Sequence, residues 1–257
     1  MDGSGFPMPT RARDVPANMA ERLIVALDVP TPDKARDVVQ ELSGVVTFFK
    51  IGLHLFVAGG TEKLIDDLVA EGKNVFLDYK MFDIGETVRQ GVARARDRGV
   101  KFITVHGDDE IMKSAVEGKG ASDRLKIFSI TVLTSLDDQD LRDMGYGVTV
   151  KELIELRVRR SIQCGCDGII ASAHDRPNEI RQMVQNDRLL IATPGIRSAG
   201  SASDDHKRLS TPTQAIANGA DYLVMGRQII NAPDRGAMAL RVIEEMKAGE
   251  RESRTPA

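Results

Sequence analysis

Asn74-Val75-Phe76-Leu77-Asp78-Tyr79-Lys80-Met81-Phe82-Asp83-Ile84 is a stretch in which an apolar run leads into a group of charges. The run predicts a buried β-strand, and successive side chains of a strand point to opposite faces. Asp78 and Lys80 are therefore expected on one face where the strand ends, and Asp83 follows as the chain turns toward a helix. Burying a charge is unfavourable unless it is paired. The three charges indicate a functional site, and a surface ion-pair cluster is the alternative.

Similar apolar runs alternate with amphipathic stretches along the chain, and many are almost continuously apolar, as strands covered on both faces are. A doubly wound open sheet is the alternative fold, but no glycine-rich dinucleotide fingerprint follows the first run. Eight such units in 257 residues predict an α/β fold, a (β/α)8 TIM barrel of a single domain. The expected strands are 23–28, 45–51, 74–80, 101–106, 125–133, 168–172, 189–193 and 222–226.

Capping residues predict where several helices begin and end. Thr31 is an expected N-cap with Pro32 in the first helical position, Thr61 opens a second helix that ends near Gly72, and Pro233 begins the last one. The expected organisation is a flexible polar extension over 1–20, the catalytic barrel over 21–247, and a polar tail over 248–257.

Composition narrows the class of partner. The formal charge is −3, no basic block stands out and Trp is absent, so nucleic acid is not expected as a partner. The N-terminal segment lacks the apolar run of a signal peptide and no segment is long enough to span a membrane, so we expect a cytoplasmic protein without a membrane partner. Cys164 and Cys166 match neither a redox nor a zinc pattern.

Charged residues close the first three expected strands: Asp28, then Lys50, then Asp78 with Lys80. The working residues of such barrels stand at the C-terminal strand ends, although a single strand-end charge can also simply reach solvent. Alternating signs keep each group ionised, since unit charges about 4 Å apart interact by roughly 4 kcal/mol at an effective dielectric of about 20. The arrangement suits a carbanion that is stabilised and then protonated, with Lys80 as the proton donor.

Two glycine-arginine segments follow the last two expected strands: Thr193-Pro194-Gly195-Ile196-Arg197 and Met225-Gly226-Arg227. Barrels commonly bind phosphate with these two loops, where backbone N–H groups and an arginine can grip an anion. Thr134, after the fifth strand, is a candidate for a hydrogen bond to a ligand ring, and a simple cap is the alternative. His106 is interpreted as a structural residue that hydrogen-bonds behind the charges.

Together these motifs resemble the bacterial type of the orotidine 5′-phosphate decarboxylase family, from Leu23 to the last helix. The resemblance rests on Ala26-Leu27-Asp28, Phe49-Lys50-Ile51-Gly52, Asp78 to Ile84 with Thr87 beyond, Leu133-Thr134-Ser135, Thr193 to Arg197, and Met225-Gly226-Arg227. It implies decarboxylation of orotidine 5′-phosphate (OMP) to uridine 5′-monophosphate (UMP) in pyrimidine biosynthesis, without a cofactor or a metal ion.

The resemblance also assigns roles to residues. Lys80 would protonate carbon 6 of the pyrimidine, Asp78 would face the departing carboxylate, and Asp28 with Lys50 would bind the ribose and complete the charge network. A homodimer is implied, because three residues would reach the neighbouring subunit's site: Asp83, Ile84 and Thr87. The remaining assignments are Thr134 at the base, Pro194 in the pocket wall, and Arg197, Gly226 and Arg227 near the phosphate.

One segment departs from the family pattern. Similar bacterial chains usually carry Gln in an Asp-Gln-x-Arg segment, whereas this chain has Asp205-His206-Lys207-Arg208. His206 can still donate a hydrogen bond to phosphate, and it adds positive charge when protonated. We therefore assign His206 to the substrate-binding residues.

Two rival functions share some of these features. A metal-dependent sugar-phosphate lyase or decarboxylase of the same superfamily carries an acidic residue at the end of the second strand, where this chain has Lys50, a cation that repels a metal ion. A barrel that binds a nucleotide or sugar phosphate without turnover would explain the phosphate segments. A barrel that only binds its ligand does not need so many buried charges.

Overall fold

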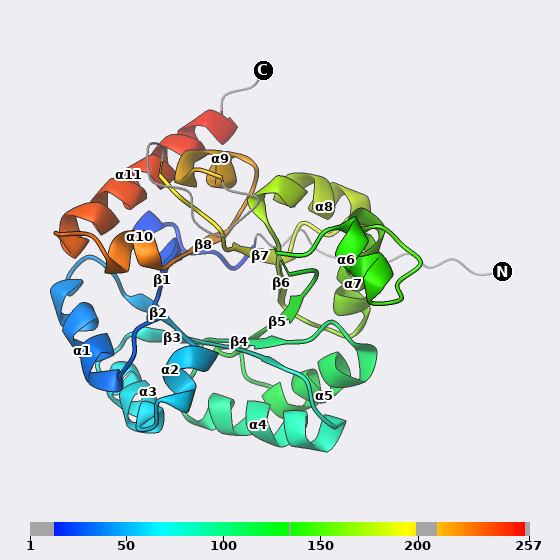
Figure 1. The fold of residues 1–257 in the computed structure, drawn as a ribbon, viewed down its shortest axis with the longest axis horizontal. Coiled ribbons are helices and arrows are strands. Elements are labelled where there is room, and N and C mark those ends of the chain that lie inside the picture. Colours follow the sequence, from blue (N-terminus) through cyan, green and yellow to red (C-terminus); the bar gives the residue numbers. More distant parts are fainter. Residues whose placement is uncertain (1–12, 134, 199–209, 255–257) are drawn as a thin grey trace.

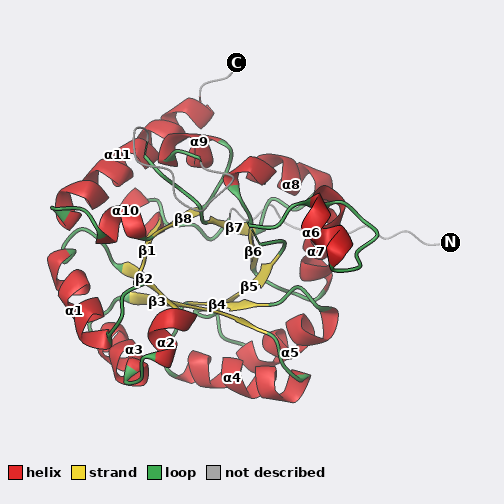
Figure 2. Ribbon diagram, viewed as in Figure 1, coloured by secondary structure: helices red, strands yellow, loops and turns green. Residues whose placement is uncertain are grey.

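A computed structural model describes residues 13–133, 135–198 and 210–254 of the chain. Within these residues eight parallel strands close into a barrel in the order of the sequence, and helices surround it (Figure 1; Figure 2). The (β/α)8 prediction is therefore confirmed. The strands are β1 (Leu23–Ala26), β2 (Phe48–Gly52), β3 (Asn74–Met81), β4 (Phe102–Val105), β5 (Lys126–Ile130), β6 (Gly168–Ile170), β7 (Leu190–Thr193) and β8 (Tyr222–Met225).

The helices follow the strands in turn, and capping residues determine where several of them begin or end. Thr31 accepts a hydrogen bond from the Lys34 N–H (3.3 Å), as expected of an N-cap. The helices are α1 (Pro32–Glu41), α2 (Leu53–Val57), α3 (Thr61–Ala70), α4 (Gly85–Asp97), α5 (Asp109–Lys119), α6 (Asp138–Asp143), α7 (Val150–Gln163), α8 (Pro177–Val184), α9 (Pro212–Ala217), α10 (Arg227–Ile230) and α11 (Arg235–Arg254), with 3-10 turns η1 (Met19–Arg22) and η2 (Ala173–Asp175).

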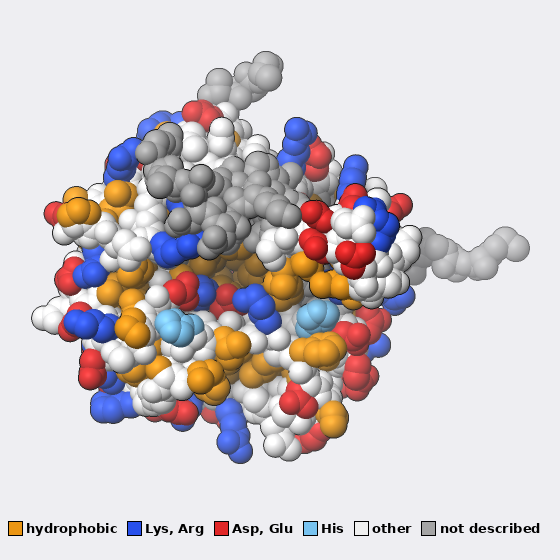
Figure 3. Space-filling view, viewed as in Figure 1, with side chains coloured by type: hydrophobic (Ala, Val, Ile, Leu, Met, Phe, Trp, Pro, Cys, Tyr) orange, Lys and Arg blue, Asp and Glu red, His pale blue; other side chains and the backbone are white. Residues whose placement is uncertain are grey.

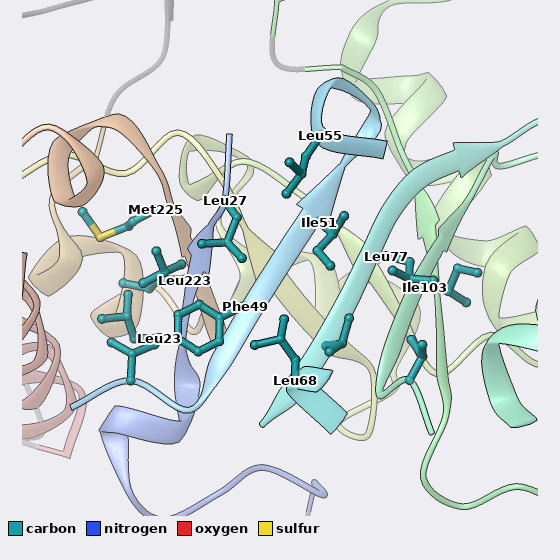
Figure 4. Packing of buried hydrophobic residues seen from close by; sticks show 14 of the residues in the cluster. Leu23, Leu27, Phe49, Ile51, Leu55, Leu68, Leu77, Ile103, Leu223 and Met225 are labelled. Carbon is teal, nitrogen blue, oxygen red and sulfur yellow. The ribbon is translucent and has the colours of Figure 1, made fainter. Parts of the chain in front are cut away.

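Alternate residues of each strand serve two different cores. Side chains such as Leu23, Phe49 and Leu77 point outward and pack in one layer with Leu55 of α2 and Leu68 of α3 (Figure 4). The intervening residues point into the barrel. Because both faces are buried, the strands are continuously apolar in sequence, which is the pattern that predicted them.

An aromatic floor fills the lower half of the barrel interior. It consists of Phe48, Phe76, Phe102, Phe128 and Tyr222, all nearly fully buried. Phe102 lies at its centre, with ring centroids 4.9 Å from Phe48, 4.5 Å from Phe128 and 5.0 Å from Tyr222. Edge and tilted contacts of this kind stabilise aromatic clusters beyond the burial of area. The packed rings therefore close the barrel interior below the C-terminal strand ends.

The ends of the barrel domain differ from expectation. Pro233 does not begin the last helix: Asp234 accepts a hydrogen bond from the Ala237 N–H (2.8 Å), and α11 starts at Arg235. The same helix continues to Arg254, so the described part of the expected tail is helical. Residues 13–20 contact the base of the barrel, where Arg13 pairs with Asp221 (3.6 Å). No helix in the described ranges is both long and apolar enough to cross a bilayer.

Candidate active site

The ends of the first three strands bring four side chains together in a charge array of Asp28, Lys50, Asp78 and Lys80. Lys50 Nζ lies 3.3 Å from Asp28 Oδ1 and 3.5 Å from Asp78 Oδ2. Lys80 Nζ lies 2.8 Å from the other oxygen of that carboxylate, Asp78 Oδ1. Signs alternate along the array, as the sequence predicted. At the mouth of the barrel, acidic and basic side chains sit side by side over these strands (Figure 3).

The array is held by local backbone features. The register between β3 and β4 shifts between Leu77 and Met81, so β3 bulges where it carries Asp78 and Lys80. Gly52 lies against the first ion pair: a Cβ there would be 3.1 Å from Lys50 Nζ and 3.3 Å from Asp28 Oδ1. A larger residue at position 52 would therefore displace the charges.

The middle of the array is buried and its two ends are accessible: the side chain of Asp28 is 47% exposed. The side chain of Lys50 is 11% exposed, that of Asp78 is 16% and that of Lys80 is 41%. Burial alone would raise the pKa of Asp78, but Lys50, Lys80 and two hydrogen bonds outweigh it and hold the pKa below its ordinary value. Asp78 is thus a carboxylate at neutral pH, and Lys80 is the cation that an incoming ligand meets.

A cavity of about 160 Å³ opens beside Asp78 and Lys80. Its remaining wall is largely apolar and includes Pro194; the other residues are Phe76, Ile130, Val132, Leu133, Ile170, Ala171, Ser172 and Val224. A larger cavity of about 1180 Å³ lies between α6, α7 and α8, away from these charges. We place the site in the smaller one, because specific sites combine an apolar wall with a few convergent polar groups.

The loops after β7 and β8 are joined beside this cavity. The Ser198 N–H donates to Gln228 Oε1 (2.9 Å), which links the loop that carries Arg197 to α10. Arg197 is half-buried, and Arg227 is exposed as the first residue of α10. Gly226 lies against the array, because a Cβ there would be 3.4 Å from Asp28 Oδ2. The expected phosphate segment therefore adjoins the expected ribose-binding residue.

Three predicted site residues lie away from the array of their own chain. Asp83 and Ile84 are exposed in the loop between β3 and α4, and Thr87 is exposed on the first turns of α4. Asp83 Oδ1 accepts a hydrogen bond from the Ile84 N–H (2.6 Å), and it makes no ion pair with the array within the described residues. The structure does not bring these three side chains to the site of the same chain.

Two predicted residues, Thr134 and His206, lie outside the described residues. The expectation that His106 hydrogen-bonds behind the charges is wrong. Its ring instead packs edge-on against Phe82, with the ring centroids 4.7 Å apart. Its buried Nδ1 has no hydrogen-bond partner among the described residues. Burial and the charge of Arg157 lower the pKa of His106, so the ring is neutral at pH 7. It supports the loop that carries Asp83.

Sequence reasoning missed Thr104, which the structure places beneath the array on β4. The side chain is fully buried, and its hydroxyl donates to Asp78 Oδ1 (2.9 Å). A signal was present: Thr104 is a polar residue in an apolar run, two residues after the inward-pointing Phe102. In the described ranges, no group of three or more His, Cys, Asp or Glu side chains is arranged to hold a metal ion.

A closed parallel barrel with paired charges and a cavity at its C-terminal mouth defines a (β/α)8-barrel enzyme. Residues 21–242 match the sequence profile of the orotidine 5′-phosphate decarboxylase / HUMPS family, and the chain belongs to that family.

Proteins named orotidine 5′-phosphate decarboxylase are similar over most of their length. That of Nitrobacter winogradskyi is 47% identical over 88% of this chain and 92% of its own, and that of Rhodopseudomonas palustris strain BisA53 is 46% identical over 90% and 97%. The crystal structure of orotidine 5′-phosphate decarboxylase from Lactobacillus acidophilus superimposes with a TM-score of 0.78 at 29% identity, covering 89% of this chain and 100% of that one.

Proposed function

We propose that the protein decarboxylates OMP to UMP in pyrimidine biosynthesis, and that Lys80 supplies the proton that replaces the carboxylate. The charge array carries the proposal: a lysine stands at the mouth of a largely apolar cavity, 2.8 Å from a carboxylate that is itself paired with a second lysine. A preorganised field of this kind stabilises charge that develops during a reaction. The family and its similar relatives support the same reaction.

The chemistry needs one bond broken and one formed. Loss of carbon dioxide breaks the bond between C6 and the carboxylate carbon, and the electron pair stays on C6. The Lys80 ammonium transfers a proton from Nζ to C6, which gives UMP and a neutral amine. Water at the mouth restores the lysine, whose side chain is 41% exposed. The contacts of Asp78 with both lysines support a role in organising Lys80.

The remaining substrate contacts follow the order of the strands. Asp28 and Lys50 bind the ribose, Thr134 the base, and Pro194 packs beside it. Arg197, Gly226, Arg227 and His206 bind the phosphate, and the joined loops after β7 and β8 support this part of the proposal. No cofactor takes part, and the reaction takes place in the cytoplasm.

The test of the proposed function is a decarboxylation assay in the presence of a chelator. We expect the ultraviolet absorbance of OMP to fall at the same rate with and without EDTA, because Lys50 occupies the place where a metal-dependent relative needs an acidic ligand. Activity lost in EDTA and restored by Mg²⁺ would favour the metal-dependent rival. Tight UMP binding without any turnover would favour a binding protein.

An apolar patch beside the mouth supports a homodimer. The patch consists of Leu53, Phe56 and Val57 on α2 with Phe82 and Ile84 in the loop before α4. Val57 is 75% exposed and Ile84 is 77% exposed. Monomeric proteins rarely leave such patches uncovered. A second copy that covers the patch would receive Asp83, Ile84 and Thr87 beside its own site, where the proposal needs them.

We expect Ile84→Asp to weaken the dimer by about 10²-fold, because an unpaired charge in a dry interface costs several kcal/mol. Sedimentation at a series of concentrations measures the dissociation constant, and the activity per subunit should fall as dimers dissociate. Leu240→Asp is the matched control, since Leu240 is 53% exposed on α11, away from the patch. Equal dissociation constants for wild type and Ile84→Asp would rule out this interface.

A further inference from the structure

The backbone of Lys80 has an unusual conformation. Its φ is +47°, in the left-handed region that a residue with a Cβ rarely adopts. The conformation lies within the β3 bulge: Leu77 pairs with Ile103 and Met81 with Val105, so four steps along β3 match two along β4. Strained backbone persists only where the surroundings over-determine it. Something must therefore hold Lys80 in place.

Thr104 is the residue opposite the bulge. Its hydroxyl accepts a hydrogen bond from the Lys80 N–H (3.0 Å) and donates one to Asp78 Oδ1 (2.9 Å). That same oxygen accepts from Lys80 Nζ (2.8 Å). One fully buried hydroxyl thus ties the backbone of the lysine to the carboxylate that holds its ammonium. The bulge leaves the Lys80 N–H without a regular ladder partner, and Thr104 replaces that partner.

We infer that Thr104 is a positioning residue for proton transfer: it fixes the distance and direction of the Lys80 ammonium without touching substrate. It is not among the residues that line the cavity, so it acts through Lys80 and Asp78. The inference rests on the proposed role of Lys80. A buried threonine that only stabilised the fold would need no bond to either residue, and an apolar strand residue would serve as well.

Three substitutions separate positioning from stability. Thr104→Val keeps the shape and removes the hydroxyl, Thr104→Ser keeps the hydroxyl, and Thr104→Ala serves if valine disturbs folding. The matched control is Ser161→Ala on α7, which removes another fully buried hydroxyl, one that bonds to the Arg157 carbonyl (2.7 Å) and to the Ser129 hydroxyl, contacts neither Asp78 nor Lys80, and does not line the cavity. The measurements are kcat and KM for OMP, UMP binding, and the dependence of kcat/KM on pH.

Thr104→Val is expected to lower kcat by about 10- to 100-fold, the effect of displacing a reacting group by a fraction of an ångström to 1 Å, with UMP binding changed by less than about threefold. Thr104→Ser is expected to restore most of the loss. The acid limb of kcat/KM moves to higher pH in the valine variant, because Asp78 loses a bond that favours its anion. Ser161→Ala leaves kcat and the pH profile as in wild type.

A kcat for Thr104→Val within about twofold of wild type would overturn the inference, as would a serine variant as slow as the valine variant. An equal loss in Ser161→Ala would also overturn it, because the effect would then be one of stability. Failure of the wild-type protein to turn over OMP would refute the proposed function, and this inference with it. Wild-type turnover with an unaffected valine variant would remove the role of Thr104 alone.

Discussion

Lys80→Ala is expected to lower kcat for OMP decarboxylation by at least about 10⁴-fold, the upper range for the loss of a general acid. The structure shows why another group does not replace the lysine. Lys50 is more deeply buried and lies between two carboxylates, 3.3 Å from Asp28 and 3.5 Å from Asp78. Binding of UMP should change by less than about tenfold, because the product carries no charge at C6 for the ammonium to stabilise.

Two further variants sharpen this prediction. Lys80→Arg keeps the positive charge but has no readily transferred proton, so it should be about as inactive as the alanine variant. Lys63→Ala removes a lysine on α3 that pairs with Asp67 (2.8 Å), and it should retain full activity. Single-turnover assays with excess enzyme measure the residual rate. An alanine variant within about tenfold of wild type would exclude Lys80 as the proton donor.

Arg227→Ala has the second-largest expected effect, a fall in kcat/KM for OMP of about 10²- to 10⁴-fold. Two hydrogen bonds from a guanidinium to a phosphate contribute about 1.5–3 kcal/mol each, and each 1.4 kcal/mol is tenfold in rate. Arg227 lies next to Gly226, where a Cβ would be 3.4 Å from Asp28 Oδ2. Phosphate binding can thus orient the ribose and base over the array and contribute to the transition state.

The nucleoside orotidine, which lacks the phosphate, provides the internal control. Arg227→Ala should leave the slow decarboxylation of orotidine unchanged, because orotidine has no phosphate for the arginine to bind. Arg241→Ala on α11 removes an arginine that pairs with Glu245 (3.1 Å), and it should leave both substrates unaffected. An Arg227→Ala variant that slows orotidine and OMP by the same factor would place the arginine in the fold of the loop and not at the phosphate.

The eight strands could be predicted from the sequence because each is buried on both faces, but their ends could not. The second strand was expected from residue 45, whereas the N–H groups of Val45 and Val46 both bond to the Leu42 carbonyl (3.1 and 3.0 Å) and close the end of α1. The fifth ends at Ile130, after which Thr131 Oγ1 donates to the Ile170 carbonyl (2.8 Å). Such hydrogen bonds end a strand without changing its hydrophobic pattern.

The array itself was predictable because charges that end adjacent parallel strands must meet at one mouth. The left-handed conformation of Lys80 was not, since lysine carries none of the preference that Gly, Asn or Asp would have shown there. Helix α2 was also missed. It exposes Leu53 and Val57, so its sequence lacks the polar outer face by which a surface helix is recognised.

The aromatic floor closes the active-site cavity at its lower end. Phe76 belongs both to the floor and to the cavity wall, so the packed rings begin directly below the site. A molecule of carbon dioxide released there cannot pass through the packed barrel interior. Both products therefore leave through the mouth of the barrel, where the substrate entered, and they must do so before the next substrate can enter it.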